Sequence, residues 1–377
     1  MKRRICYVSG TRADFGLMTR TLQLLHASRD IELGIAATGM HFSDRYGGTI
    51  SEIEHEGLTI CARIRTNVDE TTGFAMAEAI GQAILGLAGA FAAWQPDLVL
   101  LLGDRGEMLA GAIAAIHLNV PVAHVHGGER SGTVDEPIRH AISKLSHYHL
   151  AATSGAKERL VRMGENPRSI FVTGAPGLDG LSELAATPYE ELYGPLGLDP
   201  SRHVCLVVFH PVVQEAVEAA AQTRTLMEAV LSADTQIVAF APNADAGGGQ
   251  IRSVLSEFAA HPDVRFVTHL GRRLFVSWMA CADAIVGNSS AGIIEAPTLG
   301  LWAVNVGSRQ NLRERNGNVI DVPLDSGLIT AAVRDVLGRA RGTWHNVYGD
   351  GHSAARICAL LERLPLDASV LKKTNAY

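Results

Sequence analysis

The chain has 377 residues, 47% of them hydrophobic and 19% charged, which is long enough for two domains with separate cores and excludes a disordered or fibrous protein. A net charge of -6 gives no overall attraction to nucleic acid or to an anionic membrane surface, so an anionic ligand must be held by local features. The five cysteines lie far apart, mostly in apolar runs, which is typical of buried thiols in a reducing compartment. The first strand-like run ends too early for a secretory signal, and we find no apolar run long enough to cross a bilayer. We therefore expect a cytoplasmic protein with neither a nucleic-acid nor a membrane partner.

Short apolar runs recur along the first half and end in glycine or polar residues. We expect strands at Ile5 to Ser9, Leu33 to Thr38, Leu98 to Gly103, Val120 to Val125, Tyr148 to Thr153 and Ile170 to Gly174. Helix-length segments between them include Leu17 to Ala27, Ala75 to Trp94 and Gly106 to Leu118. Continuous hydrophobicity in the strands, with helices between them, predicts a parallel sheet covered on both faces. This pattern defines a first α/β domain over residues 1–182.

A second strand series follows a segment rich in proline and glycine, residues 183–202, which is typical of an interdomain link. Its expected strands are Val204 to Phe209, Gln236 to Ala241, Val264 to Thr268, Ala284 to Gly287 and Trp302 to Val306, with helices such as Gln214 to Leu231 and Leu274 to Ala280. We place a second domain at 203–355 and a C-terminal helix or tail at 356–377. Two doubly wound, Rossmann-like domains should then face each other across a cleft, because such sheets bind ligands at the carboxyl ends of their strands.

Two of the expected strand ends in the first half carry an arginine. The turn after the first strand, Gly10 to Gly16, lacks the G-x-G-x-x-G pattern of a dinucleotide site, and its Arg12 is suited to a phosphate or carboxylate, or to an ion pair with Asp14. The strand that ends at Gly103 is followed by Asp104 and Arg105, a carboxylate and a guanidinium at the ligand-binding edge. The alternative for Asp104 is a plain helix cap.

The segment from His124 to His140 concentrates titratable groups around a glycine turn, which indicates an active site. Thr133 to Glu136 matches a capping box, which gives Glu136 a structural role, whereas Glu129 and Asp135 have no such explanation. The alternative for Asp135 and Arg139, four residues apart, is a solvated ion pair. We reject a metal site at the neighbouring histidines, because His124 and His126 lack ligand spacing and no cysteine is near.

The second half carries groups suited to a nucleotide. His210 closes a strand and could donate to a phosphate or act as a general acid, and the glycine-rich loop that contains Asn243 allows close backbone approach. After the strand that ends at Gly287, Ser289 and Ser290 open an expected helix, where N–H groups and two hydroxyls can cradle a phosphate. Glu295, one to two turns along that helix, could accept from ribose hydroxyls, and Arg309 could add a second positive charge.

Eight segments together resemble one enzyme family: Ser9 to Asp14, Thr38 to His41, Gly103 to Arg105, His126 to Glu129, Asp135 to His140, Phe209 to Pro211, Pro242 to Asp245 and Gly287 to Ser290. They occur in order over almost the whole chain. On this basis the sequence is similar to the hydrolysing UDP-N-acetylglucosamine 2-epimerases of sialic-acid-type and legionaminic-acid-type sugar biosynthesis, which serve cell-surface polysaccharides.

The resemblance implies a GT-B fold, with the nucleotide on the second domain and the sugar at the cleft. It implies a hydrolase that eliminates UDP across C1 and C2 in anti fashion and then adds water, so that UDP-N-acetylglucosamine gives N-acetylmannosamine and UDP. No cofactor or metal is implied, and the family suggests a homodimer or homotetramer. The catalytic residues would be Asp104, Glu129, Asp135 and His210, and the residues that bind the substrate or its nucleotide would be Arg12, His41, Arg105, His126, Arg139, Asn243, Ser289, Ser290, Glu295 and Arg309.

Three other readings remain. The same reaction could act on UDP-N,N'-diacetylbacillosamine or on GDP-N-acetylglucosamine, because the sugar pocket is not legible in the sequence. A GT-B glycosyltransferase would bind the same nucleotide but need an acceptor. A regulator that binds a nucleotide sugar without turnover is the last.

Overall fold

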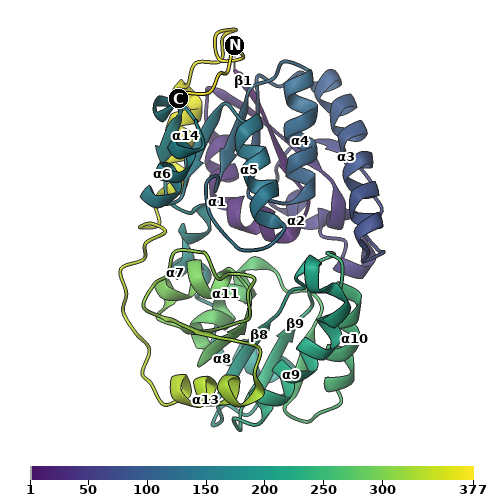
Figure 1. The fold of residues 1–377 in the computed structure, drawn as a ribbon, viewed down its shortest axis with the longest axis vertical. Helices are drawn as coiled ribbons and strands as arrows, with labels where there is room; N and C mark the ends of the chain where they lie inside the picture. The colour runs from purple at the N-terminus through teal and green to yellow at the C-terminus, as the bar shows by residue number, and fades with distance from the viewer. Residues whose placement is uncertain (1) are drawn as a thin grey trace.

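The computed structural model describes residues 2–377 and contains two parallel β-sheets, one above the other in Figure 1. The first has seven strands in the order β3-β2-β1-β4-β5-β6-β7, and the second has six in the order β10-β9-β8-β11-β12-β13. Both orders are those of doubly wound sheets, which confirms the expected α/β class.

The strands of the first sheet are β1 Arg3–Ser9, β2 Ile31–Ala37, β3 Ile60–Arg63, β4 Leu98–Leu102, β5 Val122–Val125, β6 Tyr148–Ala151 and β7 Ile170–Val172. Its helices are α1 Arg12–Ala27, α2 Ile50–His55, α3 Gly73–Trp94, α4 Gly106–His117, α5 Asp135–Leu145 and α6 Ser154–Arg162. Alternate residues of β1 enter different cores: Ile5 and Tyr7 pack with α1, while Cys6 and Val8 pack with α3 and α4. Both faces of the sheet are therefore buried, which explains the unbroken apolar runs.

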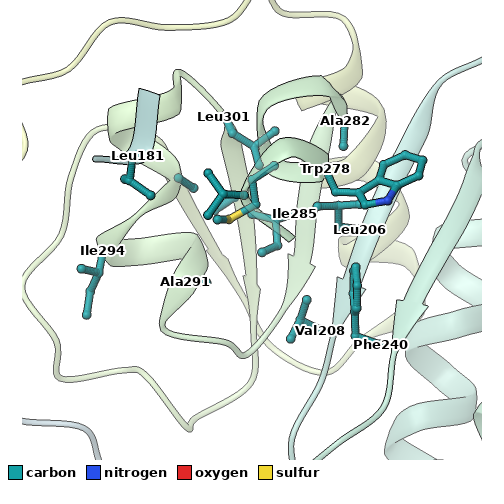
Figure 2. Packing of buried hydrophobic residues seen from close by; sticks show 14 of the residues in the cluster. Leu181, Leu206, Val208, Phe240, Trp278, Ala282, Ile285, Ala291, Ile294 and Leu301 are labelled. Atoms are coloured by element: carbon teal, nitrogen blue, oxygen red, sulfur yellow. The ribbon is translucent and has the colours of Figure 1, made fainter. Parts of the chain in front are cut away.

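The strands of the second sheet are β8 Val204–Val208, β9 Gln236–Phe240, β10 Val264–Val267, β11 Ala284–Gly287, β12 Trp302–Val306 and β13 Val319–Val322. Its helices are α9 Ala219–Leu231, α10 Gly248–Phe258, α11 Arg272–Cys281, α12 Ala291–Ile294 and α13 Ser326–Leu337. One of its cores packs Leu206 and Val208 of β8 with Phe240 of β9 and Trp278 of α11 (Figure 2). Short 3-10 helices are η1 Gly39–Phe42, η2 Asp44–Tyr46, η3 Pro167–Ser169, η4 Pro176–Leu178, η5 Val213–Glu218 and η6 Ala296–Leu299.

The segment expected to be a featureless link is folded. Residues 183–202 contain α8 Tyr189–Leu196, preceded by α7 Leu181–Leu184. Leu192, Tyr193 and Leu198 are buried in the same core as Trp278, and the Tyr193 ring lies 5.2 Å from that indole. The proline- and glycine-rich composition therefore hides a short helix that packs on the second sheet.

The chain returns to the first sheet at its end. Helix α14, Ser353–Arg363, packs against α1, and Ile357 and Leu361 enter the first core (Figure 1). Beyond it, Lys373 donates to Glu165 over 2.6 Å and to the carbonyl of Ser146 over 2.6 Å. The last residues are thus fastened to the half of the molecule where the chain begins.

Helix α3 corrects one expectation from composition. By length and apolar content it qualifies as a possible membrane span, although we found no such run in the sequence. In the fold it covers the first sheet beside α4, with Ala75, Ala83, Leu87 and Phe91 buried. Its opposite face is exposed and includes Phe74 and Leu85, which are 79% and 78% accessible.

Each sheet has one point where the strand order reverses, and these points position the site. In the first sheet β1 has β2 on one side and β4 on the other, and in the second sheet β8 lies between β9 and β11. The loops that leave β1 and β4, and those that leave β8 and β11, diverge there and leave a crevice. Arg12 and Asp104 follow the first pair of strands, and His210 and Ser289 follow the second.

Candidate active site

A cavity of about 310 Å³ lies where the two reversal points meet. Residues of both halves line it: Arg12, Asp104, Arg105, His126, Glu129 and Arg139 from the first, and His210, Asn243, Ser289, Ser290, Glu295, Arg309 and Arg313 from the second. Twelve of the fourteen residues that the sequence singled out are in this lining. The exceptions are Asp135, which lines an adjoining cavity, and His41.

Asn288 joins the two loops of the second wall. Its side-chain oxygen accepts from the backbone N–H of His210 over 2.7 Å, and its side-chain nitrogen donates to the His210 carbonyl over 2.8 Å. Gly287, just before it, has a φ of 132°, and a Cβ there would lie 2.3 Å from the Val208 carbonyl oxygen. Only glycine allows this approach of β11 to β8, and Asn288 depends on it.

The serine segment differs from the expected phosphate-binding helix. Helix α12 spans only four residues, Ala291–Ile294, so its macrodipole contributes little, and Ser289 and Ser290 are the polar residues of this segment that line the cavity. Glu295 is expected inside a long helix, but it lies at the C-terminal end of the short helix α12. There it is buried and forms an ion pair with Arg272 of α11. Glu295 still lines the cavity, as do Phe240 and Phe275.

His210 is held as a neutral imidazole. Burial, followed by the positive charges of Arg309, Arg105 and Arg12, keeps the pKa of His210 well below its usual range. The backbone N–H of Asn243 lies 3.4 Å from its Nδ1, which then accepts and leaves the proton on Nε2. The proton of the imidazole is therefore on Nε2, which is free to donate a hydrogen bond. The positive charges of Arg309, Arg105 and Arg12 act on this ring.

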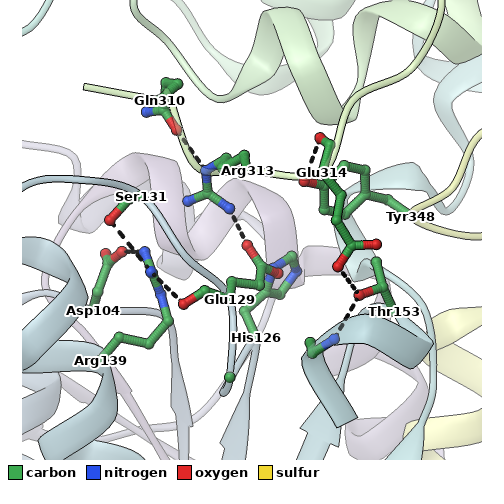
Figure 3. A network of polar contacts seen from close by, with 12 residues as sticks. Asp104, His126, Glu129, Ser131, Arg139, Thr153, Gln310, Arg313, Glu314 and Tyr348 are labelled. Carbon is green, nitrogen blue, oxygen red and sulfur yellow. Dashed lines mark hydrogen bonds and ion pairs between the residues drawn. The ribbon is translucent and has the colours of Figure 1, made fainter. Parts of the chain in front are cut away.

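Three carboxylates of the first half meet arginines around the cavity, and Figure 3 shows two of them, Asp104 and Glu129. Asp104 forms an ion pair with the buried Arg139 of α5 and makes no side-chain cap for α4, so the capping alternative is wrong. Glu129 forms ion pairs with His126 and with Arg313, which reaches across from the second half. Burial alone would raise the pKa of Glu129, but the charges of His126 and Arg313 outweigh it and lower the pKa to about 2.

His126 owes its position to an unusual backbone. Its φ of 63° lies in the left-handed region that few residues other than glycine adopt. The turn that follows needs Gly128 at a φ of 79°, where a Cβ would lie 2.4 Å from the Ala156 carbonyl oxygen of α6. This strained turn brings the His126 ring against Glu129, and strain of this kind is typical of functional sites.

The third carboxylate, Asp135, opens α5 and accepts from Arg309 across the interface, with 3.3 Å between Nη2 and Oδ2. The alternative of an ion pair with Arg139 is wrong, because Arg139 pairs with Asp104. The expected capping box is also wrong: Val134 is the N-cap without a side-chain bond, and Glu136 accepts from the N–H groups of Ser131 and Gly132 over 2.8 and 3.1 Å.

The other two arginines of the first half also have partners across the interface. Arg12 contacts Nδ1 of His269 over 2.6 Å, and His269 contacts Glu52 over 2.8 Å through Nε2. Arg12 does not pair with Asp14, which is buried and caps α1 together with Thr11. Arg105 lies 3.5 Å from Asp245 of the second half and 3.3 Å from Glu107 of the first.

His41 does not reach the cavity. It is fully buried, and its ring nitrogens contact the hydroxyls of Ser9 and Thr49, each over 2.8 Å. The histidines near the glycine turn have internal partners as well. His124 donates to the Gly103 carbonyl over 2.7 Å, His149 pairs with Glu165 over 2.8 Å, and His147 accepts from the N–H of Val122 over 3.0 Å.

Sequence reasoning missed two arginines of this site, Arg313 and Arg272. Arg313 lies in a loop after β12 whose sequence, residues 308–315, contains three arginines, and that cluster was the available signal. Arg272 opens α11 and touches both Glu295 and the Gly177 carbonyl, the latter over 2.8 Å. Neither side chain follows a strand directly, which is where reasoning about parallel sheets looks first.

Two doubly wound halves, with serine hydroxyls and arginines on one wall of the cavity and carboxylates on the other, match enzymes of the nucleotide-sugar class. The sequence model of the UDP-N-acetylglucosamine 2-epimerase family matches residues 23–362, and the chain belongs to this family.

Relatives and solved structures agree with the assignment. The chain is 49% identical, over the full length of both sequences, to a hydrolysing UDP-N,N'-diacetylbacillosamine 2-epimerase of Legionella pneumophila. It is 35% identical to a UDP-N-acetylglucosamine 2-epimerase of Neisseria meningitidis serogroup B, over 89% of this chain and 87% of that one. The crystal structure of a Neisseria meningitidis UDP-GlcNAc 2-epimerase bound to UDP-GlcNAc superposes with a TM-score of 0.78 at 19% identity, over 95% of this chain and 99% of that one, which supports the GT-B-like fold.

Proposed function

We propose that the chain is a hydrolysing 2-epimerase of UDP-linked 2-acetamido sugars, which releases UDP and a free sugar inverted at C2. The observation that carries the proposal is the cavity itself, where a serine cradle and arginines face three carboxylates. We place UDP-N,N'-diacetylbacillosamine first among substrates, because the Legionella relative matches over the full length of both chains. UDP-N-acetylglucosamine, first in the expectation from sequence, is the second candidate, in line with the Neisseria relative.

In this proposal the second half holds the nucleotide. The hydroxyls and N–H groups of Ser289 and Ser290 and the Nε2–H of His210 bind the diphosphate, with Arg309 neutralising its charge. Phe240 and Phe275 offer an apolar wall to the uracil ring of the nucleotide, and the buried Glu295 accepts hydrogen bonds from the ribose hydroxyls. Arg12, Arg105 and Asn243 complete the grip at the boundary between the halves.

The first half then supplies the proton chemistry. A carboxylate removes the C2 proton, the C1–O bond breaks, and its electron pair leaves with UDP, which gives a 2-acetamidoglycal. Water then adds across the double bond, with its oxygen at C1 and a proton at C2. A carboxylate positioned beside the C2–H bond is a suitable base for this proton transfer.

We assign the base to Asp135. Glu129 is unsuited because its pKa is about 2, and Asp104 is bound to a buried arginine. Asp135 accepts a hydrogen bond from Arg309. The same guanidinium donates to the Asn288 carbonyl over 3.2 Å, beside the serine cradle. A diphosphate in that cradle competes for Arg309, so substrate binding itself releases the Asp135 carboxylate from its ion pair. Glu129, His126 and Arg139 then position the sugar.

Product analysis with separate nucleotide sugars tests the proposal. We expect release of UDP, without any acceptor, together with a free sugar of manno configuration. Release of UDP only when an acceptor is added would instead establish a glycosyltransferase. Binding without turnover of any of the three nucleotide sugars named above would establish a regulator.

Three further features belong to the same proposal. We propose residues 1–182 and 203–355 as domains that close on the substrate, with 356–377 fastened to the first. The five free cysteines fit a reducing cytoplasm.

The exposed apolar face of α3 suits a second copy of this chain, in a homodimer or homotetramer. Light scattering that compares the mass of the purified protein with that of a Leu85→Glu variant tests this.

A further inference from the structure

The ammonium group of Lys373, in the C-terminal segment, is surrounded by oxygens of the first half. It donates to the main-chain carbonyls of Ser143, Lys144 and Ser146 over 3.1, 2.8 and 2.6 Å. It also forms an ion pair of 2.6 Å with Glu165. An ammonium group has three N–H donors, so these acceptors use all of them. The contact is therefore unlike that of a surface lysine, whose donors bind water.

The three carbonyls belong to the C-terminal turn of helix α5 and its cap. The last carbonyls of an α-helix have no partner within the helix and carry a partial negative charge, which favours a cation beside them. Lys373 supplies that cation from between 227 and 230 residues further along the chain. The end of α5 is thus held by a group that is distant in sequence.

Helix α5 carries groups of the active site on the face that this turn shares. Asp135, Arg139 and Ser143 are four residues apart and therefore lie on one face of the helix. Asp135 is the proposed base, and Arg139 pairs with Asp104. Ser143, whose carbonyl Lys373 binds, is fully buried at the other end of the same face. A shift of the C-terminal turn of this eleven-residue helix therefore moves the base.

The side chain of Ser143 provides a second connection to the site. Its hydroxyl contacts Nδ1 of His124 over 3.1 Å, and Nε2–H of that ring donates over 2.7 Å to the carbonyl of Gly103, the residue before Asp104. The glycine turn packs against the same hydroxyl, because a Cβ at Gly127 would lie 3.0 Å from Ser143 Oγ. Ser143 thus contacts both turns of the first half that carry carboxylates of the site.

Glu165 keeps the ammonium group at the end of α5. Its buried carboxylate also binds His149 over 2.8 Å and Lys144 over 2.7 Å, and Lys144 donates to Asn375 over 2.6 Å. Burial alone would raise the pKa of Glu165, but hydrogen bonds from His149 and the two lysines outweigh it and lower the pKa to about 2. The carboxylate that binds Lys373 is therefore charged at neutral pH.

We propose that Lys373 is a positioning residue of the active site, which holds the C-terminal turn of α5 and thereby sets where Asp135 and Asp104 meet the sugar. This inference rests on the proposed function, because it names a residue on which the same reaction depends. The four oxygens that bind Lys373 lie in the first half, whereas the nucleotide is proposed to bind the second. Turnover and UDP affinity should therefore respond differently to its loss.

Paired substitutions of adjacent lysines provide the test. Lys373→Met keeps the length of the side chain and removes the ammonium group, and Lys372→Met makes the same change at an exposed position. We expect kcat of Lys373→Met, per UDP-binding site counted by calorimetric titration, to fall about tenfold or more, because small misplacements of reacting groups are costly. Its UDP affinity should be retained, and Lys372→Met should match the parent in both quantities.

Added amines test whether the hydrogen bonds of the ammonium group are what matters. Lys373→Ala leaves room for ethylammonium, which should raise kcat of this variant severalfold, whereas tetramethylammonium has the same charge but no N–H donor and should not. Purification with ethylammonium present stabilises the variant should it unfold without the amine. Equal kcat in the two salts would overturn this role of Lys373.

Hydrogen exchange separates this inference from the proposed function, because it needs no turnover. Amides of residues 135–143 should exchange faster in Lys373→Met than in Lys372→Met when followed by mass spectrometry. Equal exchange and equal kcat in these two variants would overturn the inference and leave the proposed reaction standing. If the parent turned over none of the nucleotide sugars, the proposed function would fail, and exchange would still decide whether Lys373 holds α5.

Discussion

Arg309 donates to Asp135 across the interface between the two halves, with 3.3 Å between Nη2 and Oδ2. The same guanidinium donates to the Asn288 carbonyl over 3.2 Å, beside the serine cradle. One arginine thus connects the group proposed to take the C2 proton with the place proposed for the diphosphate. In the proposed mechanism, this contact couples removal of the C2 proton to nucleotide binding.

Replacing Asp135 by Asn removes the proposed base and keeps the size of the side chain. We expect turnover to fall about 10²-fold to 10⁴-fold, the usual contribution of general base catalysis, with UDP affinity retained. Steady-state kinetics and calorimetric titration with UDP measure the two quantities. Asp234→Asn, at a position whose side chain is 95% exposed, is the matched control and should behave as the parent. Undiminished turnover would remove Asp135 from the mechanism.

Arg313→Gln tests the electrostatics of Glu129. Loss of the arginine removes an opposite charge that lowers the pKa of Glu129 to about 2, so that pKa should rise. The titration of the Glu129 carboxyl, followed by carbon-13 NMR, should then move to higher pH by about one unit or more. Arg315→Gln, in the same loop but paired with Asp321 at 3.0 Å, should leave this titration in place. A Glu129 titration that is the same in both variants would contradict this role of Arg313.

His210 should take up a proton when UDP binds. Burial and three arginines hold the pKa of His210 well below its usual range, and a diphosphate placed beside it favours the charged form and raises that pKa. Calorimetry near pH 6 in buffers of different ionisation enthalpy measures the uptake. His210→Asn should abolish it. Equal proton uptake with and without the imidazole would place the diphosphate elsewhere.

His124 should make folding stability depend on pH. Burial lowers its pKa to about 3 in the folded protein, against about 6.5 when unfolded, so between these values the unfolded state binds more protons. Its contribution is complete above about pH 6.5 and declines as the pH falls, by up to about 1.4 kcal/mol per pH unit. Urea unfolding at pH 7, 6 and 5 should show a shallower decline for His124→Gln. Parallel slopes would be inconsistent with a buried neutral imidazole.

Much of the fold could be predicted from the sequence because the central strands are buried on both faces. β1, β4 and β8 read as unbroken apolar runs for this reason. The edge strands β3 and β13 were missed, because each has four residues that are mostly half-buried or exposed and neither forms an apolar run. Helix α8 was missed because its Gly194 and Pro195 are signals of a loop.

The positions of the candidate site residues were predictable, but their pairings were not. Strand ends at the reversal points located Arg12, Asp104, His210 and Ser289, since parallel strands present their carboxyl ends at one edge. Local spacing matched a capping box with Thr133 at the start of α5, but Val134 is the N-cap and makes no side-chain bond. The ion pair of Asp135 with Arg139, the alternative that the four-residue spacing offered, does not form either. Contacts between the halves, such as that of Arg309 with Asp135, decide these partners, and no local pattern encodes them.

Turnover of UDP-N,N'-diacetylbacillosamine in deuterated water tests the central claim most directly. The account predicts free 2,4-diacetamido-2,4,6-trideoxymannose that carries deuterium at C2, because the C2–H bond is broken and water supplies its replacement. Released sugar that retains protium at C2, or that keeps the gluco configuration, would contradict it.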